Sequence, residues 1–304
     1  MRSADFTEDI VYQWQKKWSE YDLRQAVENC QEDTVGFPYF LKYLPKKGLI
    51  LEAGCGLGQW VVYLSRLGYH MIGVEIVPDC VQMCKTHFPN VDIRVGDVRN
   101  LPFPDAYFDG YISIGVIEHM IEGPESILRE LKRVIKPGGI AIITVPAYNY
   151  FLRAWYPLRK FIVEPFRKNH LIRKVLGKPA LLYDKFDGQI KSIKIKKQLR
   201  AELWPIVGID AVKGPIFIEY KYKKGYFDCL LESFDFKIIE SVPVHHPLIF
   251  QDTFGNLFFK KSCLKNEKNN LQLNILGKIV KRIFDQVSPH FFNYLYLYVV
   301  KAKI

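Results

Sequence analysis

The feature that most constrains the fold of this chain is a loop in which three glycines alternate with other residues. Gly54, Gly56 and Gly58 follow the apolar run 49–51 and precede a segment, 60–67, whose apolar residues recur at spacings of four and three. The pattern predicts a strand, a tight loop and a helix in that order. Glycine lets a backbone bend sharply and approach a ligand closely, and the first amides of a helix attract polar or anionic groups. We therefore expect a ligand-binding loop here.

Strand-like and helix-like segments alternate on both sides of this loop, from about residue 48 to residue 145. This alternation is typical of βαβ units with a buried parallel sheet. One helix packed on the sheet is predicted by an apolar stripe of Ile127, Leu128, Leu131, Val134 and Ile135. The segment 137–139, Pro-Gly-Gly, predicts a turn into the next strand. We expect a further helix at 225–234 and strands at 49–51, 70–75, 91–95, 108–114, 140–145, 237–244 and 294–302.

Charge is distributed unevenly along the chain. The segment 151–225 contains 18 basic and 6 acidic residues, so it accounts for essentially all of the formal net charge of +11. Its prolines and short apolar pieces lack strand periodicity, and we interpret 151–224 as a basic helical lid inserted after the fifth strand. A second insertion, 245–292, contains a predicted amphipathic helix with Leu276, Ile279, Ile283 and Val287 on one face. Residues 1–35 are expected to form an N-terminal helical cover.

Several positions around the glycine loop carry matching signals. Glu52 lies two residues before Gly54, Glu75 ends the second predicted strand, and Asp97 follows the third. The glycine spacing is GxGxG, whereas the dinucleotide fingerprint is GxGxxG. Together with the helix-to-strand segment 131–139, these residues resemble class I S-adenosylmethionine-dependent methyltransferases over about 36–150 and the last two strands.

The resemblance implies a fold, a cofactor and a set of contacts. The fold is an α/β Rossmann-like doubly wound sheet of seven strands, mostly parallel with an antiparallel last strand, formed by 36–150 and 225–304. The cofactor is S-adenosylmethionine: Glu52 lies near its amino group, Glu75 accepts the ribose hydroxyls, and Asp97 meets the adenine amino group. The expected cofactor-binding residues are Glu52, Gly54, Gly56, Gly58, Glu75, Ile76, Asp97, Val98 and Ile114.

Methyl transfer requires positioning and exclusion of water, and an oxygen acceptor must also lose a proton. His119 follows the fourth predicted strand and titrates in the useful range, so we interpret it as a general base or an acceptor-orienting group. The alternative is a structural residue that begins a helix. Tyr148, Asn149 and Tyr150, after the fifth strand, are expected either to line the acceptor pocket or to begin the lid. No cluster has metal-ligand spacing, and no metal is expected.

The acceptor class follows from the same resemblance. The pair Glu118-His119 and the loop 101–105 are most similar to the small-molecule branch that includes ubiquinone-biosynthesis methyltransferases, which favours O-methylation of a small-molecule or lipid-linked acceptor. Two alternatives stay open: a catalytically idle binding or assembly subunit, and an RNA-directed enzyme that uses the basic insertion. Nucleic acid is disfavoured because the sequence contains no recognisable RNA-binding motif.

The lid composition bears on location. Aromatic and basic residues interleave in 151–168, which suits an anionic membrane surface, or equally a lid whose aromatic rings pack inward. No apolar run reaches about 18 residues, and the N-terminus lacks a secretory signal. We therefore expect a cytoplasmic protein, with a peripheral position at the inner face of a membrane as an alternative.

Overall fold

The computed structural model describes residues 3–18, 21–158, 161, 203–210, 214–245, 273–291 and 293–304. The chain divides into two compact units. The first consists of Met1–Val145, Gly225–Val242 and Leu297–Ile304, and the second of Pro146–Lys224 and Pro243–Tyr296. These two units do not correspond one to one with the predicted cover, core, lid and second insertion, and that functional division stays a prediction.

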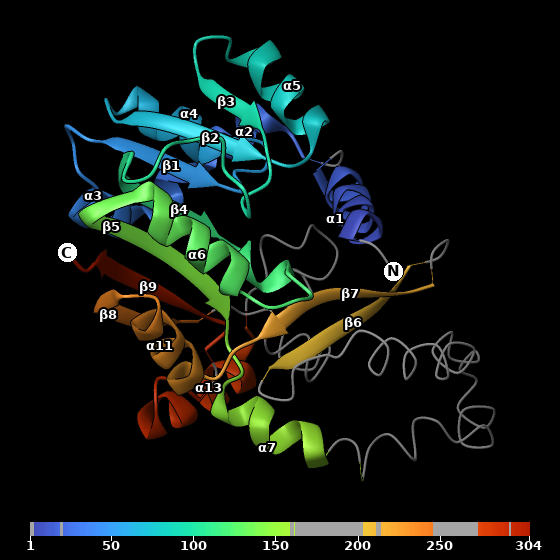
Figure 1. Ribbon diagram of the computed structural model, residues 1–304. Coiled ribbons are helices and arrows are strands. Elements are labelled where there is room, and N and C mark those ends of the chain that lie inside the picture. The colour runs from blue at the N-terminus through green and yellow to red at the C-terminus, as the bar shows by residue number, and fades with distance from the viewer. Residues whose placement is uncertain are drawn as a thin grey trace. The chain divides into compact units, whose positions relative to one another are not determined.

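The central element is a seven-stranded sheet with the strand order β3-β2-β1-β4-β5-β9-β8 (Figure 1). Parallel pairing joins β1 to β2 and β4, β2 to β3, and β4 to β5, and Figure 1 shows β9 running against β5. The expected Rossmann-like mixed sheet is confirmed. Its strands are β1 (Leu49–Ala53), β2 (His70–Glu75), β3 (Asp92–Val95), β4 (Phe108–Ile114), β5 (Ile135–Pro146), β8 (Phe236–Val244) and β9 (Leu295–Ala302).

Helices connect the parallel strands and bury one face of each against the sheet. The predicted stripe on α6 is buried in its helical part, at Ile127, Leu128, Leu131 and Val134. The strand β5 begins earlier than expected: the segment 137–139 is an irregularity within the strand, where Gly138 has a φ of 80°. The helices of this unit are α1 (Ser3–Trp18), α2 (Leu23–Asn29), η1 (Cys30–Glu32), α3 (Phe37–Tyr43), α4 (Gln59–Arg66), α5 (Pro78–His87), η2 (Ile117–His119), α6 (Glu125–Val134) and α11 (Lys224–Ser233).

Register aligns the carboxyl ends of the central strands. Glu52 pairs with Gly73 on β2 and with Ile112 on β4, so β1, β2 and β4 end at one edge of the sheet. In an open α/β sheet, ligands bind outside the carboxyl ends of the strands, where the strand order reverses. Here the order reverses between β1 and β4, directly beside the glycine loop.

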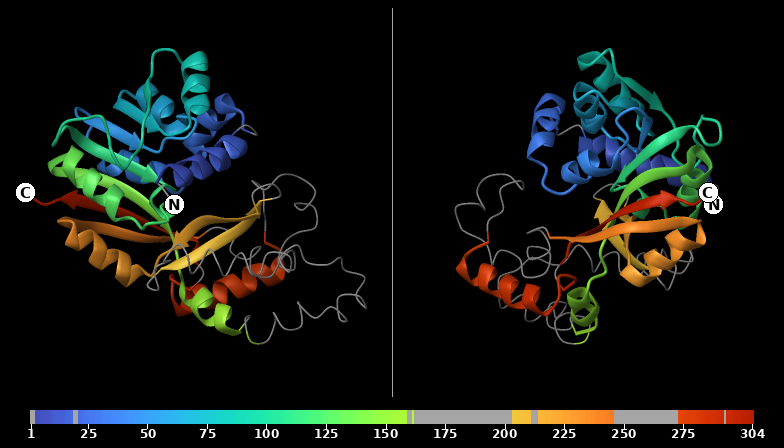
Figure 2. Two further views of the ribbon diagram at one scale, coloured as in Figure 1. Left: turned by 45° about the vertical axis from the view of Figure 1, so that its right-hand side comes forward. Right: turned by 90° about the vertical axis from the view of Figure 1, so that its left-hand side faces the viewer.

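The insertion 151–224 was expected to be helical, and this prediction is wrong for part of it, because the second unit also contains strands. It contains the helices α7 (Tyr150–Leu158) and α13 (Ile275–Val287), but also an antiparallel hairpin of β6 (Trp204–Asp210) and β7 (Gly214–Lys221), visible in Figures 1 and 2. Both strands are rich in β-branched and aromatic residues, and the dense lysines around them obscured this preference. The predicted amphipathic helix is confirmed as α13. Among the described residues, no helix is both long and apolar enough to cross a bilayer.

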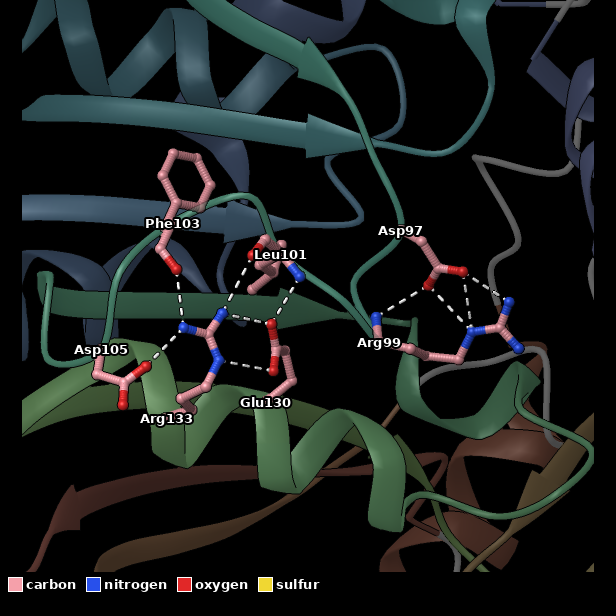
Figure 3. Close-up of polar contacts among 7 residues, drawn as sticks. All are labelled: Asp97, Arg99, Leu101, Phe103, Asp105, Glu130 and Arg133. Carbon is pink, nitrogen blue, oxygen red and sulfur yellow. Dashed lines mark hydrogen bonds and ion pairs between the residues drawn. The ribbon is translucent and has the colours of Figure 1, made fainter.

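Arg133 on α6 fixes the loop between β3 and β4 (Figure 3). Its guanidinium donates to the carbonyl oxygens of Leu101 (3.0 Å) and Phe103 (2.8 Å) and to the Asp105 carboxylate (2.8 Å). It also pairs with Glu130 (2.6 and 3.0 Å), whose carboxylate accepts the Leu101 backbone amide. The guanidinium hydrogen bond holds the pKa of Glu130 below its usual value. Arg133 and Glu130 of α6 together thus bind the backbone of the loop at Leu101 and Phe103.

Replacing Arg133 by alanine should lower the free energy of unfolding by about 1–3 kcal/mol, because two carbonyl groups and two carboxylates lose their partner at a half-exposed site. In the wild type the part of this contribution that comes from Glu130 is present above the usual pKa of Glu130 and lost as pH falls through the lowered one. Urea unfolding at several pH values measures both effects. Arg129→Ala, an exposed position on the same helix, is the matched control; equal losses in the two variants would contradict the assignment.

Candidate active site

The loop between β1 and α4 has a backbone that only glycine adopts readily. Gly54, Gly56 and Gly58 have φ angles of 76°, 55° and 79°. A Cβ atom would lie 2.5 Å from Val116 Cγ2 at Gly54, 2.7 Å from Trp18 Cζ2 at Gly56, and 2.9 Å from Cys84 Sγ at Gly58. Side chains are therefore excluded at these three positions by both conformation and space, and the main chain itself forms the surface of the loop.

Glu52 enters this loop from β1 as a buried carboxyl group with an open oxygen. Only 3% of the residue is exposed. Burial raises the pKa of Glu52 well above its usual value, against a backbone hydrogen bond at Val61 that lowers it. Its Oε2 atom is buried and accepts no hydrogen bond from any residue that the structure describes. Because an open buried oxygen is costly, the site fits a ligand that brings a donor or a positive charge.

Glu75, the last residue of β2, ties the strand to the glycine loop. One carboxylate oxygen accepts the backbone N–H of Gly56 (2.8 Å) and the other accepts that of Val77 (3.1 Å). Burial raises the pKa of Glu75, and hydrogen bonds from the backbone of Gly56, Val77 and Ile76 oppose this shift. An ionised carboxylate has about four lone-pair sites, so with three backbone amides bound it can still accept a ligand hydroxyl. The sequence indicated the ligand role of Glu75 but not its hold on the loop.

Asp97 follows β3 and is held by Arg99 (Figure 3). Its carboxylate accepts the Arg99 backbone amide (2.8 Å), the Nε atom (3.0 Å to each oxygen) and Nη2 (2.6 Å). Burial raises the pKa of Asp97, but the Arg99 hydrogen bonds outweigh it and keep the pKa below its usual range. Arg99 also reaches Glu122 (3.0 Å) in the segment after β4. Arg99 was not predicted from the sequence, although a basic residue two positions after a strand-end aspartate was the available signal.

The remaining predicted cofactor positions lie at strand ends of the same sheet. Ile76 follows β2 and is half-buried, Val98 is buried directly after Asp97, and Ile114 ends β4 and is half-buried. These apolar side chains follow the carboxyl ends of β2, β3 and β4, whose alignment is set by the register of the sheet. Their contacts with a cofactor stay a prediction.

His119 lies in η2, just after β4. Its backbone amide donates to the Val116 carbonyl (3.1 Å), as a structural residue in a short turn would. Its ring meets Trp14 edge to face, with 4.9 Å between ring centroids. Helix α1 therefore contributes Trp14 beside His119 and Trp18 against Gly56. Neither tryptophan was assigned to the site from the sequence, because nothing local to α1 specifies what it covers.

Tyr148, Asn149 and Tyr150 belong to the second unit. Asn149 is buried; its amide nitrogen donates to the Asn293 carbonyl (2.7 Å) and its oxygen accepts the Leu152 backbone amide (2.8 Å). The Tyr148 ring stacks on Trp204, with 5.1 Å between centroids, and Tyr150 is half exposed. Asn149 thus has a structural role at the start of α7, and acceptor contacts by the three residues stay a prediction.

A doubly wound sheet with an alternating-glycine loop and carboxylates at the ends of β1 and β2 defines a nucleotide-cofactor domain of the class I methyltransferase type. Comparison with known proteins agrees, since residues 51–143 match the family described as "Methyltransferase domain". Residues 51–143 are therefore a methyltransferase domain, and S-adenosylmethionine is its methyl donor.

The chain also resembles individual proteins, but each match covers only part of the relative. The chain is 34% identical over 41% of its length to a tRNA (carboxymethyluridine(34)-5-O)-methyltransferase of Arabidopsis thaliana, of which it covers 31%. It is 27% identical over 49% of its length to a demethylmenaquinone methyltransferase of Staphylococcus haemolyticus, of which it covers 67%. Curated relatives at 34% identity are covered over less than half of their length.

A solved structure supports the fold. A methyltransferase from Methanosarcina mazei superposes with a TM-score of 0.53 over 88% of this chain and 98% of its own, at 17% identity. At 17% sequence identity, this similarity shows only that the two proteins share a fold.

Glu75→Gln should weaken binding of S-adenosylhomocysteine about 10- to 100-fold, because a charged acceptor for ligand hydroxyls becomes neutral and one of its oxygens becomes a donor. Titration calorimetry measures the affinity, and circular dichroism verifies that the variant folds. Asp92→Asn changes an exposed carboxylate at the start of β3 and should leave affinity unchanged. Wild-type affinity in the Glu75 variant would remove this residue from the site.

Proposed function

We propose that the whole chain is an active methyltransferase that transfers the methyl group of S-adenosylmethionine to a small-molecule or lipid-linked acceptor, with oxygen as the favoured acceptor atom. The observation that carries this proposal is the combination of the open Glu52 oxygen, the glycine main chain at 54–58 and the Glu75 carboxylate. These three features offer an anionic partner for an ammonium group, a close main-chain surface and acceptors for hydroxyl groups. A scaffold without a nucleotide ligand has no need of all three.

The residues divide the work of holding the cofactor. Glu52 pairs with its amino group, Gly54, Gly56 and Gly58 admit its amino-acid portion, and Glu75 accepts its ribose hydroxyls. Ile76, Val98 and Ile114 pack on the adenine and ribose, and Asp97, oriented by Arg99, accepts the adenine amino group. When bound, the cofactor supplies an electrophilic methyl group, so the protein has only to orient the acceptor, exclude water and accept a proton.

His119 is the proposed proton acceptor or acceptor-orienting group. It follows β4 at the carboxyl-end edge of the sheet, and an imidazole can accept a hydroxyl proton near neutral pH. Trp14 beside its ring restricts water on that side. We also propose that the acceptor contacts the rings of Tyr148 and Tyr150 and the backbone of Asn149. The side-chain amide of Asn149 is excluded from this role because it is hydrogen-bonded within its own unit.

The acceptor proposal draws on the relatives. A demethylmenaquinone methyltransferase, covered over 67% of its length, supports a small or lipid-linked acceptor. The similarity to a tRNA (carboxymethyluridine(34)-5-O)-methyltransferase supports oxygen as the acceptor atom. It also keeps an RNA acceptor as the second candidate, which the positive charge of the segment 151–224 favours as well. Most of that segment lies outside the described residues. Of the stretch 151–168, proposed to meet an anionic membrane, 151–158 and 161 are described, and Phe151 and Tyr156 pack against the core around Leu152 and Leu273. A cytoplasmic location remains a prediction.

Comparative mass spectrometry of cell extracts tests the proposal. Extracts incubated with the protein and S-adenosylmethionine should gain about one methyl group, roughly 14 Da, on an organic-soluble small molecule or lipid. The Glu75→Gln protein is the matched control and should produce much less of the same species. A gain confined to RNA nucleosides would favour the second candidate. Absence of S-adenosylhomocysteine binding would favour the idle binding or assembly subunit.

Replacement of His119 by alanine or asparagine should lower kcat about 10²- to 10⁴-fold on an oxygen acceptor, because the proton then lacks a positioned base. The affinity for S-adenosylhomocysteine should not change, and the acidic limb of the kcat/KM pH profile, where protonation of the imidazole removes the base, should disappear. His87→Ala, on an exposed position of α5, is the control. Near-normal turnover of both His119 variants would leave the residue with a structural role.

A further inference from the structure

Helix α13 carries more apolar surface than its own unit buries. Its residues Val280 and Phe284 pack against the small core around Leu152 and Leu273. Five other apolar side chains of the same helix remain exposed, by 79%, 51%, 51%, 54% and 69% in chain order, and we call them the exposed stripe: Ile275, Leu276, Ile279, Ile283 and Val287. Scattered exposed apolar residues are ordinary, whereas five on a single short helix indicate a surface that another phase or molecule covers.

The exposed stripe has a defined place on the helix. At about 100° per residue, its five members fall within an arc of about 120°, which Gln286 shares. One border of this arc adjoins Val280 and Phe284, which pack inward, and the opposite border adjoins Lys278 and Arg282, which are exposed. The helix thus has a packed sector, an apolar exposed sector and a basic sector.

The start of the helix is fixed independently of the stripe. The Asn274 side chain caps it by accepting the Gly277 backbone amide (2.8 Å). An N-cap of this kind stabilises the first turn, where Ile275 and Leu276 lie. The first turn of the helix that carries the stripe is therefore capped within the chain.

We propose that α13 docks the protein on an anionic lipid bilayer, with the exposed stripe inserted among the acyl chains and Lys278 and Arg282 at the level of the headgroups. Charge complementarity supports this occupant: the helix contains three basic residues and one acidic residue, in a chain of formal charge +11. An apolar face bordered by lysine and arginine is typical of helices that lie in the membrane interface.

The docking does not depend on the proposed methyl transfer. A helix of this kind would hold the chain at a bilayer whether or not the cofactor is bound, and a lipid-linked acceptor would then lie in the same phase. Cofactor affinity and vesicle binding are thus separate readouts, and failure of one leaves the other interpretable.

Sedimentation of the full chain with vesicles tests the proposal. Vesicles of equal parts phosphatidylcholine and phosphatidylglycerol should pellet the protein at low salt, and pure phosphatidylcholine should pellet far less. Ile279→Ser with Ile283→Ser should lower the partition coefficient at least about tenfold, because two inserted side chains become polar. Lys278→Gln with Arg282→Gln should lower it about tenfold or more on anionic vesicles and flatten its dependence on salt.

The controls separate docking from misfolding and from self-association. Leu41→Ser with Ile239→Ser removes two apolar side chains exposed by 48% and 42% on other elements, and should leave vesicle binding unchanged. All variants should keep wild-type affinity for S-adenosylhomocysteine and wild-type thermal unfolding. No pelleting of the wild type, or pelleting that both α13 variants retain, overturns the proposal. So does a wild-type dimer that the Ile279 and Ile283 replacements dissociate without any vesicle binding.

Discussion

The hydrogen bonds from the Gly56 and Val77 amides to the buried Glu75 carboxylate are the contact on which the site depends. They join the end of β2 to the loop that leaves β1, so two neighbouring strands share one buried anion. The loop itself is closely packed, because side chains at Gly54, Gly56 and Gly58 would collide with Val116, Trp18 and Cys84. A ligand that binds there meets a surface already shaped by the fold.

Around this centre the molecule uses buried charge in two ways. Arg133 and Glu130 satisfy each other and the backbone of the 101–105 loop, so their charge serves stability. Glu52 is buried more deeply and keeps an oxygen without a partner among the described residues, so its carboxyl group is available to a ligand. Buried polar groups with all partners supplied belong to the architecture, and a buried group with an open acceptor marks the site.

Much of the fold and the cofactor side of the site followed from local pattern. Apolar runs with the period of strands and helices placed most elements of the sheet within a few residues, and the glycine spacing with Glu52 and Glu75 located the loop. The hairpin β6–β7 was missed because basic residues dominate its surroundings and mask a β-branched preference. The early start of β5 was missed because Gly138 resembles a turn in sequence but forms a bulge in the sheet.

The sequence by itself determined that a glycine loop lies between a strand and a helix, that carboxylates follow strand ends, and that α13 has an apolar face. Those features depend on residues within a few positions of one another. Tertiary structure alone decided that Glu75 holds Gly56, that Trp14 and Trp18 of α1 lie against His119 and Gly56, and that Val280 and Phe284 are packed while the exposed stripe is not. The physical reason is that such contacts join segments distant in the chain, and only packing selects which of many equally apolar or polar partners meet.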